Sequence, residues 1–126
     1  MSGSDSKRDD GQNYFLSLDR QWIGYEKGYW VTFRVRRVEV SEERPHGFQY
    51  SLSLHDANDD RVLGYNNAHA VAVGSGPATR SRRPKAHDHI NRRDNRPVPY
   101  EFTTPYKLLQ DFFADVDKIL KKEGVL

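Results

Sequence analysis

Cysteine is absent from this 126-residue chain, and methionine occurs only once. Without cysteine, the chain can form no disulfide framework, no thiolate zinc site and no cysteine nucleophile. It also lacks the run of about eighteen apolar residues that a membrane-spanning helix requires, so we expect no membrane association. Residues 1–11 contain no apolar stretch of the kind found in secretory signals. These absences predict a soluble protein of the cytoplasm.

Apolar residues are scarce, but aromatic residues are not. The mean hydropathy is −0.90 and 30% of the residues are charged, whereas aromatic residues make up 12%. Disordered chains rarely contain so many aromatic residues, so we expect a folded core. Residues 1–12 are dominated by Ser, Gly, Asp, Lys and Arg, and we expect them to be a disordered tail. Residues 13–126 have the length of a single domain.

Positive charge is concentrated in one segment. Between Thr79 and Pro97 there are seven cationic side chains and two carboxylates, an excess of five charges, although the net charge of the whole chain is only +2. Such a basic segment favours a polyanion, above all the phosphates of a nucleic acid. The predicted phosphate-binding residues are Arg80, Arg82, Arg83, Lys85, Arg92, Arg93 and Arg96.

Three segments have the alternation of apolar and polar residues that is typical of β-strands. Residues 29–40 and 48–55 alternate most regularly, and a turn at residues 41–47 separates them. Residues 61–66 are the expected return strand after a turn at residues 56–60. Antiparallel strands in meander order, with one apolar face, are the result.

The remaining apolar runs are shorter. Residues 14–18 favour a short strand or an irregular apolar segment, and residues 100–102 favour a short edge strand. Residues 74–98 begin and end with Gly or Pro clusters and are too many for an ordinary connection. We therefore expect a long mobile basic loop there.

The best-defined helix signal follows this loop. Thr104 can cap a helix that begins with Pro105, and Gly124 is the expected stop. Seven apolar residues recur at helical spacing and should face the sheet: Tyr106, Leu109, Phe112, Phe113, Val116, Ile119 and Leu120. The residues expected to face away are Lys107, Gln110, Asp111, Asp115, Lys118 and Lys122.

These elements together predict an α+β fold of two layers. The first layer is an antiparallel meander sheet of three to five strands. The second is the one long C-terminal helix, which packs on the apolar face of the sheet. The long basic loop at about residues 74–98 precedes the helix.

Two histidines lie inside the basic segment. His87 and His89 flank Asp88, and their side chains point the same way if the segment is extended. Two imidazoles can act as base and acid at a phosphodiester, one taking the 2′-hydroxyl proton and the other protonating the leaving oxygen. Neighbouring arginines would stabilise the charged transition state. The other interpretation is that both are exposed loop residues that only add to the basic patch.

Metal binding is a competing use of the same side chains. His69, His87, His89 and Asp88 could supply imidazole and carboxylate ligands. The surrounding cations would repel a divalent ion, and the spacing matches no known ligand pattern. We therefore expect neither a metal nor another cofactor.

Polar residues occupy the end of the strand at residues 61–66. Tyr65, Asn66 and Asn67 lie just before the long loop, where side chains at a strand end can line a site. Tyr65 is a third candidate catalytic residue, and Asn66, Asn67 and Asp88 are candidate site-lining residues. Alternatively, the two asparagines only supply the backbone conformations of a turn.

The strand at residues 29–40 offers a second basic surface. Its arginines, Arg34, Arg36 and Arg37, could contact phosphates while aromatic residues such as Trp30 and Tyr50 stack on the bases of RNA. The alternative is that Tyr50 belongs to the core and that the arginines form a solvated face.

Four phrases occur in a recognisable order: Leu63-Gly64-Tyr65-Asn66-Asn67, His87-Asp88-His89, Pro99-Tyr100-Glu101-Phe102 and the helix sequence Leu108 to Val116. This order resembles the TumE-type toxins of bacterial and archaeal toxin–antitoxin pairs. In that family, a tyrosine–acid or amide–asparagine phrase leads to a short basic loop with a His-x-His pattern, and Pro-Tyr-x-Phe and Asp-Phe/Trp-x-x-Asp-Val phrases follow. Here Asn66 stands where the family commonly has an acidic residue, and the loop before His87 is longer than usual.

The resemblance implies a small cytoplasmic toxin that a partner antitoxin neutralises, and the antitoxin would carry a helix-turn-helix DNA-binding domain. Such toxins often attack RNA, so our first hypothesis is a metal-independent endoribonuclease with His87 and His89 as acid and base. The second is a non-enzymatic module whose basic loop orders on a nucleic acid or a partner protein. In a third, the antitoxin covers the basic loop and toxicity arises elsewhere on the sheet. The sequence leaves the oligomeric state open.

Overall fold

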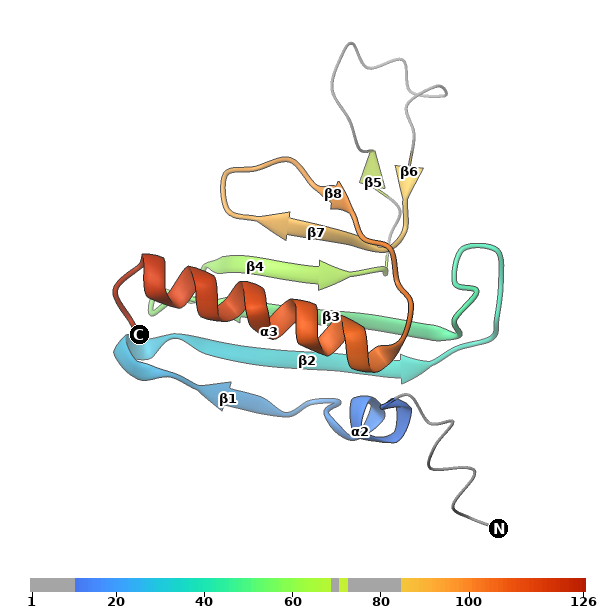
Figure 1. Ribbon diagram of the computed structural model, residues 1–126, viewed down its shortest axis with the longest axis horizontal. Coiled ribbons are helices and arrows are strands. Elements are labelled where there is room, and N and C mark those ends of the chain that lie inside the picture. Colours follow the sequence, from blue (N-terminus) through green and yellow to red (C-terminus); the bar gives the residue numbers. More distant parts are fainter. Residues whose placement is uncertain (1–10, 69–70, 73–84) are drawn as a thin grey trace.

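The structure is a computed structural model, which describes residues 11–68, 71–72 and 85–126. Six strands form one antiparallel sheet in the order β1-β2-β3-β4-β7-β8, and a long helix, α3, crosses one face of this sheet (Figure 1). A short helix, α2, packs beside α3 on the same side. The two-layer α+β fold predicted from the sequence is confirmed, with one strand more than the expected maximum.

The strands of the sheet are β1 (Trp22–Gly24), β2 (Trp30–Arg37), β3 (Phe48–His55), β4 (Arg61–Asn66), β7 (His89–Arg92) and β8 (Val98–Pro99). A separate pair is formed by β5 (Val71–Ala72) and β6 (Lys85–Ala86). A single 3-10 turn, η1 (Glu26–Gly28), connects β1 to β2. Among the described residues, no helix is both long and apolar enough to cross a membrane.

The centre of the sheet follows the alternation in the sequence. β2 and β3 pair without interruption from Trp30 opposite His55 to Arg37 opposite Phe48. The apolar positions of both strands are buried on the side of α3, where the ring of Phe33 meets that of Phe112. The strands predicted within residues 29–40, 48–55 and 61–66 are therefore confirmed.

Helix α3 (Pro105–Lys122) begins and ends where the sequence predicts. The Thr104 hydroxyl accepts a hydrogen bond from the main-chain N of Lys107 at 3.1 Å, which satisfies one of the free N–H groups of the first turn. Gly124 follows the helix with a φ of 77°, a conformation that glycine adopts without strain. The apolar face needs one correction, because Leu108 is buried whereas Tyr106 is 60% exposed.

The polar face of α3 also needs a correction. Asp111 and Asp115 were expected to face away, but both are half-buried and turned toward the sheet. They accept hydrogen bonds at 2.7 Å from the hydroxyls of Tyr100 and Tyr65, respectively. Tyrosine hydroxyls at the border of the core need such acceptors, and helical periodicity alone does not reveal them.

The N-terminal segment is a helix, neither the short strand nor the irregular apolar segment that the sequence favours. α2 (Gln12–Ser17) buries Phe15 completely, with its ring 5.4 Å from that of Phe48 and 6.1 Å from that of Tyr50. The apolar run is too short to show a helical or a strand periodicity in the sequence. Its conformation therefore depends on the burial of this one aromatic residue. The fold also includes Gly11 and Gln12, which the sequence assigns to the tail. Residues 1–10 lie outside the described part.

The predicted loop at residues 74–98 is partly sheet. β7 pairs with β4, and β8 pairs with β7, so residues 89–92 are a strand within the sheet. The edge strand expected at residues 100–102 lies two residues earlier, at Val98–Pro99. After it, the main-chain N of Tyr100 donates to the oxygen of Asp88, and the Phe102 ring lies against His46. Residues 73–84 lie outside the described part, so a mobile loop there stays a prediction.

Candidate functional site

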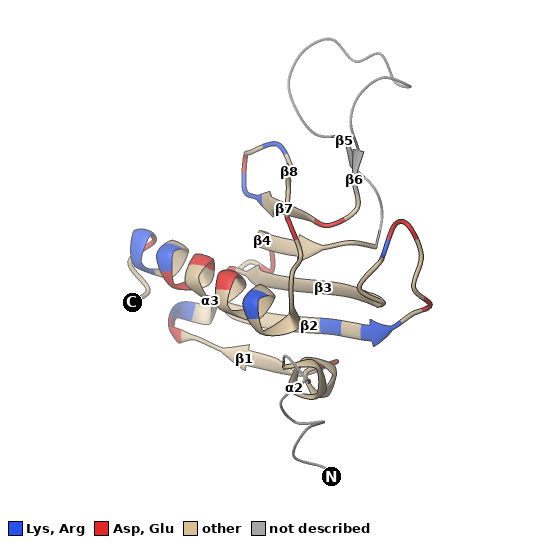
Figure 2. Cartoon of the chain, turned by 45° about the vertical axis from the view of Figure 1, so that its right-hand side comes forward, with Lys and Arg blue, Asp and Glu red and all other residues tan. Residues whose placement is uncertain are grey.

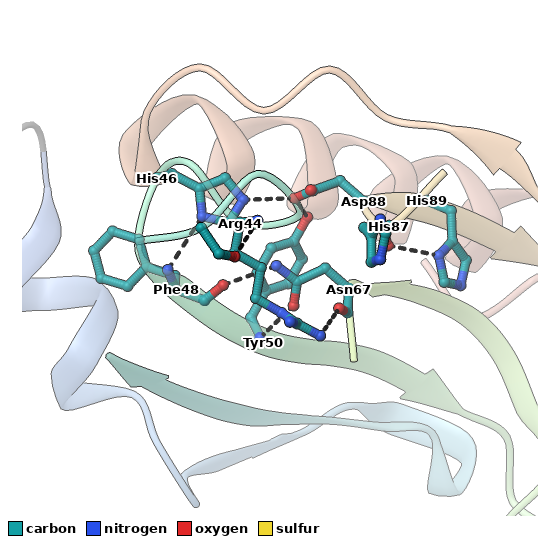
Figure 3. Close-up of polar contacts among 9 residues, drawn as sticks. Arg44, His46, Phe48, Tyr50, Asn67, His87, Asp88 and His89 are labelled. Atoms are coloured by element: carbon teal, nitrogen blue, oxygen red, sulfur yellow. Dashed lines mark hydrogen bonds and ion pairs between the residues drawn. The ribbon is translucent and has the colours of Figure 1, made fainter. Parts of the chain in front are cut away.

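Asp88 is held in place by long-range hydrogen bonds (Figure 3). Its Oδ2 accepts a bond from the Tyr50 hydroxyl at 2.7 Å and lies 3.0 Å from Nε2 of His46. Its main-chain oxygen accepts a bond from the N of Tyr100 at 2.9 Å. Only 13% of the Asp88 side chain and 11% of the His46 side chain are exposed. Asp88 is thus fixed through both its side chain and its backbone.

The surroundings of His46 select one form of its ring. Nδ1 accepts a hydrogen bond from the main-chain N of Phe48 at 3.2 Å, so Nε2 carries the hydrogen that it donates to Asp88. The ring centroid lies 4.0 Å from that of Phe102. Both ring nitrogens of His46 are therefore engaged, and this histidine is a clamp for Asp88.

Tyr50 is the second donor to Asp88. Burial, followed by the charge and the hydrogen bond of the nearby Asp88 carboxylate, raises the pKa of Tyr50 far above its usual value. The hydroxyl therefore keeps its proton and remains a donor. The alternative in which Tyr50 belongs to the core is confirmed, since only 1% of this residue is exposed.

The anchored Asp88 determines where its two neighbours point. Figure 3 shows the Asp88 carboxylate directed toward His46 and Tyr50, and the rings of His87 and His89 directed away from it. His87 and Asp88 form a bend between β6 and β7, and β7 begins at His89. The structure therefore brings His87 and His89 to one side of their segment and places Asp88 on the other.

His89 has a defined tautomer. Its Nδ1 lies 2.9 Å from the main-chain oxygen of His87, which can only accept, so Nδ1 carries a hydrogen, and in the neutral ring Nε2 is the acceptor. His89 is only 2% exposed, whereas His87 is half-buried. His89 is opposite Asn66 in the sheet, while the buried residues Tyr65 and Ile90 form the next pair on the side of α3. Asn66 and His89 thus share the face of the sheet away from α3.

Tyr65 and Asn67 lie elsewhere. The Tyr65 hydroxyl donates to Asp115 under α3, and burial, together with that bond, raises the pKa of Tyr65 well above its usual value. The Asn67 amide is completely buried and continues the β3–β4 pairing, since its Oδ1 accepts from the N of Tyr50 at 2.9 Å and its Nδ2 donates to the oxygen of Phe48 at 2.8 Å. The structure does not bring these two side chains to the histidines.

Two of the described cations of the basic segment have acidic neighbours. Arg92 lies 2.6 Å from Asp115, and Arg93 lies 2.5 Å from Asp56. Although burial acts in the opposite direction, the bond from Arg93 and two main-chain N–H groups lower the pKa of Asp56. Arg96 is exposed, and Lys85 lies in β6. The candidates outside the described residues are Arg80, Arg82, Arg83 and, for a metal, His69.

A search against protein-family models matches residues 17–120 of the chain to the family described as Toxin TumE. The chain belongs to this toxin family. Neither the search of curated proteins nor the search of solved structures found a match. The family makes the chain a toxin of a toxin–antitoxin system and implies a cognate antitoxin as its partner. The resemblance predicted from the sequence is confirmed.

The matched part of this TumE-family toxin includes all of the residues around Asp88. Two of them were missed by sequence reasoning. His46 clamps Asp88, and Arg44 donates through Nη2 to the main-chain oxygens of Asn67 at 2.9 Å and Ala68 at 2.8 Å, which fixes the chain just after β4. Both lie in the segment Arg44-Pro45-His46-Gly47, which the sequence marks only as a turn. No local pattern identifies the partners of these two side chains.

Proposed function

We propose that this TumE-family toxin cleaves RNA without a metal ion, with His89 as the general base and His87 as the general acid. The observation that carries this proposal is the hydrogen bond from His89 Nδ1 to the main-chain oxygen of His87 at 2.9 Å. With Nδ1 engaged, Nε2 of the neutral His89 ring is the proton acceptor. The same bond holds the ring of His89, the base, against the backbone of His87, the acid.

The reaction is an internal transesterification. His89 Nε2 takes the proton of a ribose 2′-hydroxyl, and the 2′-oxygen attacks the adjacent phosphorus. The bond from phosphorus to the 5′-oxygen breaks, and protonated His87 gives its proton to that leaving oxygen. The products are a 2′,3′-cyclic phosphate and a 5′-hydroxyl end. Cationic residues of the basic segment would stabilise the charge on the phosphoryl oxygens: Arg80, Arg82, Arg83, Lys85, Arg92, Arg93 and Arg96.

Asp88 and its two clamps have positioning roles in this proposal. They turn Asp88 away from the substrate, so that His87 and His89 lie on the other side. Asn66 lines the site, because it is the partner of His89 across the sheet. Tyr65 and Asn67 have structural roles, since their polar groups bond to α3 and to β3.

The test is cleavage of a defined RNA by the purified toxin in the presence of EDTA, with analysis of the product ends. We expect His87→Ala and His89→Ala each to reduce cleavage by about 100-fold or more and to relieve growth arrest. Tyr65→Phe is the matched control and should keep full activity. If the double histidine variant still arrests growth, or if the toxin arrests growth and leaves RNA intact, the mechanism is wrong.

A non-enzymatic function is the second candidate, and the burial of His89 favours it. A ring that is 2% exposed contributes more readily to structure than to catalysis. In that case the basic segment orders on a nucleic acid or a partner protein. Nucleic-acid binding that weakens steeply with salt and survives loss of both histidines would support this candidate against the first.

The antitoxin is proposed to carry a helix-turn-helix domain and to cover the basic segment. Inspection of the adjacent reading frame tests the first point. For the second, reversal of charge at the exposed Arg96 should weaken the complex of toxin and antitoxin, whereas the same change at Lys118 on α3 should not. An unchanged affinity at Arg96 would place the antitoxin on another surface.

A further inference from the structure

No helix or strand of the described part of the chain covers the face of the sheet opposite α3 (Figure 1). We call this the open face. Its side chains can be assigned from the strand register, because residues directly opposite each other in antiparallel strands point to the same side. They are Trp22 on β1; Trp30, Thr32, Arg34 and Arg36 on β2; Gln49, Ser51, Ser53 and His55 on β3; Asn66 on β4; and His89 and Asn91 on β7.

One row of this face connects a free arginine to the candidate site. Arg34, Ser51, Asn66 and His89 are successive partners across β2, β3, β4 and β7. Adjacent strands lie about 4.8 Å apart, so the row spans about 14 Å. The side chain of Arg34 makes no hydrogen bond or ion pair with any described residue and is exposed. A cation is therefore available in line with His89.

Aromatic rings lie beside this row. The rings of Trp30 and His55 stack at a centroid distance of 4.3 Å, and Trp22 is 69% exposed. Gly24 is the partner of Trp30, and a Cβ added to Gly24 would lie only 3.2 Å from Cζ3 of Trp22. The Trp22 indole thus lies over β1, in space that the missing side chain leaves open. Trp22 and Trp30 line a shallow hollow of about 530 Å³ together with Thr32.

The charges of the open face suit a polyanion. None of its described side chains is acidic, and Arg34 and Arg36 add two cations near the end of β2, where Figure 2 shows basic residues gathered. The guanidinium of Arg61 adds a cation over Gly64, where it lies 3.2 Å from the position of an added Cβ. Two carboxylates border the face, but Asp19 accepts the N–H of Val35 at 2.8 Å and Asp59 accepts the Trp30 indole N–H at 3.2 Å.

We propose that the open face binds single-stranded RNA, with bases stacked on Trp22 and Trp30 and phosphates on Arg34 and Arg61. An exposed ring on a sheet can stack only on an unpaired base, and the bases of a duplex are hidden from it. The bound strand runs toward His89. This inference rests on the proposed function, because the single-stranded RNA on the open face would be the substrate that His87 and His89 cleave.

The chain provides its own probe for this test. It contains two tryptophans, Trp22 and Trp30, and both are on the open face. Tryptophan emission of the full chain should be quenched as a short 2′-O-methyl oligoribonucleotide is added, because stacked bases quench the indole. This oligonucleotide has no free 2′-hydroxyl, so binding is measured without cleavage. The duplex of the same sequence should cause no comparable quenching.

Two substitutions make the measurement specific. We expect Trp22→Ala to weaken binding by about 5- to 100-fold, the effect of removing one base–aromatic stack. Arg34→Gln should reduce the slope of log affinity against log salt by about 0.7, the value for one phosphate contact of a single strand. Tyr106→Ala and Lys118→Gln on α3 are the matched aromatic and cationic controls and should change neither quantity.

Several results would overturn the proposal. The first is the absence of quenching, and the second is wild-type binding by both Trp22→Ala and Arg34→Gln. A third is loss of antitoxin binding in Trp22→Ala with unchanged RNA binding, which would assign the face to a protein. Cleavage with an unchanged KM in both variants rejects the open face but keeps the ribonuclease. Quenching by the oligonucleotide without cleavage of ordinary RNA keeps the open face as a binding surface and rejects the ribonuclease.

Discussion

Asp88 shows how a few buried polar residues can set the geometry of a site. The Tyr50 hydroxyl and the His46 ring both bond to one carboxylate oxygen, and all three side chains are largely buried. Buried polar groups are costly when they lose a partner and nearly neutral when each is satisfied. The cluster therefore adds little to the free energy of unfolding, but any conformation of residues 87–89 that breaks its hydrogen bonds is costly.

This asymmetry predicts different effects for two substitutions in the cluster. Asp88→Ala leaves the buried Tyr50 hydroxyl without an acceptor and should lower the free energy of unfolding by about 1–3 kcal/mol. Tyr50→Phe removes the donor and leaves Asp88 its bond to His46, so it should cost about 0.5–1.5 kcal/mol. Urea unfolding measures both. Equal costs would show that the hydroxyl finds another acceptor when Asp88 is lost.

Asp56 predicts a dependence of stability on pH. The Arg93 guanidinium and the N–H groups of Asn58 and Asp60 hold the pKa of Asp56 below its usual value, although burial acts in the opposite direction. Such a carboxyl group stabilises the fold above its unfolded pKa, and this contribution is lost as the pH falls through the folded pKa. Asp56→Asn should therefore be less stable than the wild type at pH 7, and the difference should shrink below about pH 4.

Urea unfolding at a series of pH values measures this difference. Asp94→Asn is the control, because Asp94 is exposed and has a φ of 63°, which asparagine also tolerates. It removes a carboxylate at the surface and leaves the pair of Asp56 and Arg93 intact, so the stability at pH 7 should change little. A constant difference between Asp56→Asn and the wild type down to acidic pH would mean that the ion pair is not the cause.

At the scale of single residues, the sequence indicates the two candidate histidines but not the residues that support them. His87 and His89 can be found because they are adjacent titratable groups in a basic segment. His46 and Asp88 are 42 positions apart, and nothing in the turn at Arg44 to Gly47 indicates that its histidine faces a carboxylate. Contacts of this kind depend on the folded sheet, which brings the two segments together.

At the scale of elements, regular alternation and clear caps predict well, whereas short segments do not. β2 and β3 are long enough to show their period, and the Thr104-Pro105 pair marks the start of α3. β1 has three residues and β7 lies in a basic stretch, so neither has a hydrophobic pattern of its own. Their positions depend on pairing with β2 and β4, and the residues of β1 and β7 alone do not reveal these partners.

The start of α3 predicts a local effect on stability. Thr104→Ala removes the acceptor for the N–H of Lys107 and should lower the free energy of unfolding by about 1 kcal/mol. Thr103→Ala is the matched control, because Thr103 is exposed and lies one position before the cap. Thermal unfolding followed by circular dichroism compares the two. Equal stability of both variants would show that water replaces the hydroxyl at no cost.

At the scale of the whole molecule, one hydrophobic core joins the two layers. The completely buried ring of Phe112 meets the rings of Phe33 on β2 and Tyr65 on β4 at centroid distances of 6.2 and 5.6 Å. No second buried cluster is found among the described residues. We therefore expect the sheet and α3 to unfold together.

Phe112→Ala tests this cooperativity. The cavity it leaves should cost about 3–5 kcal/mol, a large part of the stability of a small domain. Near- and far-ultraviolet circular dichroism should show one coincident transition. Tyr106→Ala on the same helix removes a 60% exposed ring and should change the stability little. Separate transitions of helix and sheet in Phe112→Ala would contradict a single core.

The clamp around Asp88 also determines when, during synthesis, residues 87–89 can reach their folded geometry. His46 lies against Phe102, and the backbone of Asp88 is tied to Tyr100, so the clamp needs residues that the ribosome adds after both histidines. A nascent chain that ends before Tyr100 contains His87 and His89 but lacks the Tyr100 and Phe102 contacts that complete the clamp. The pair is therefore assembled late in translation, and incomplete chains carry its residues without its geometry.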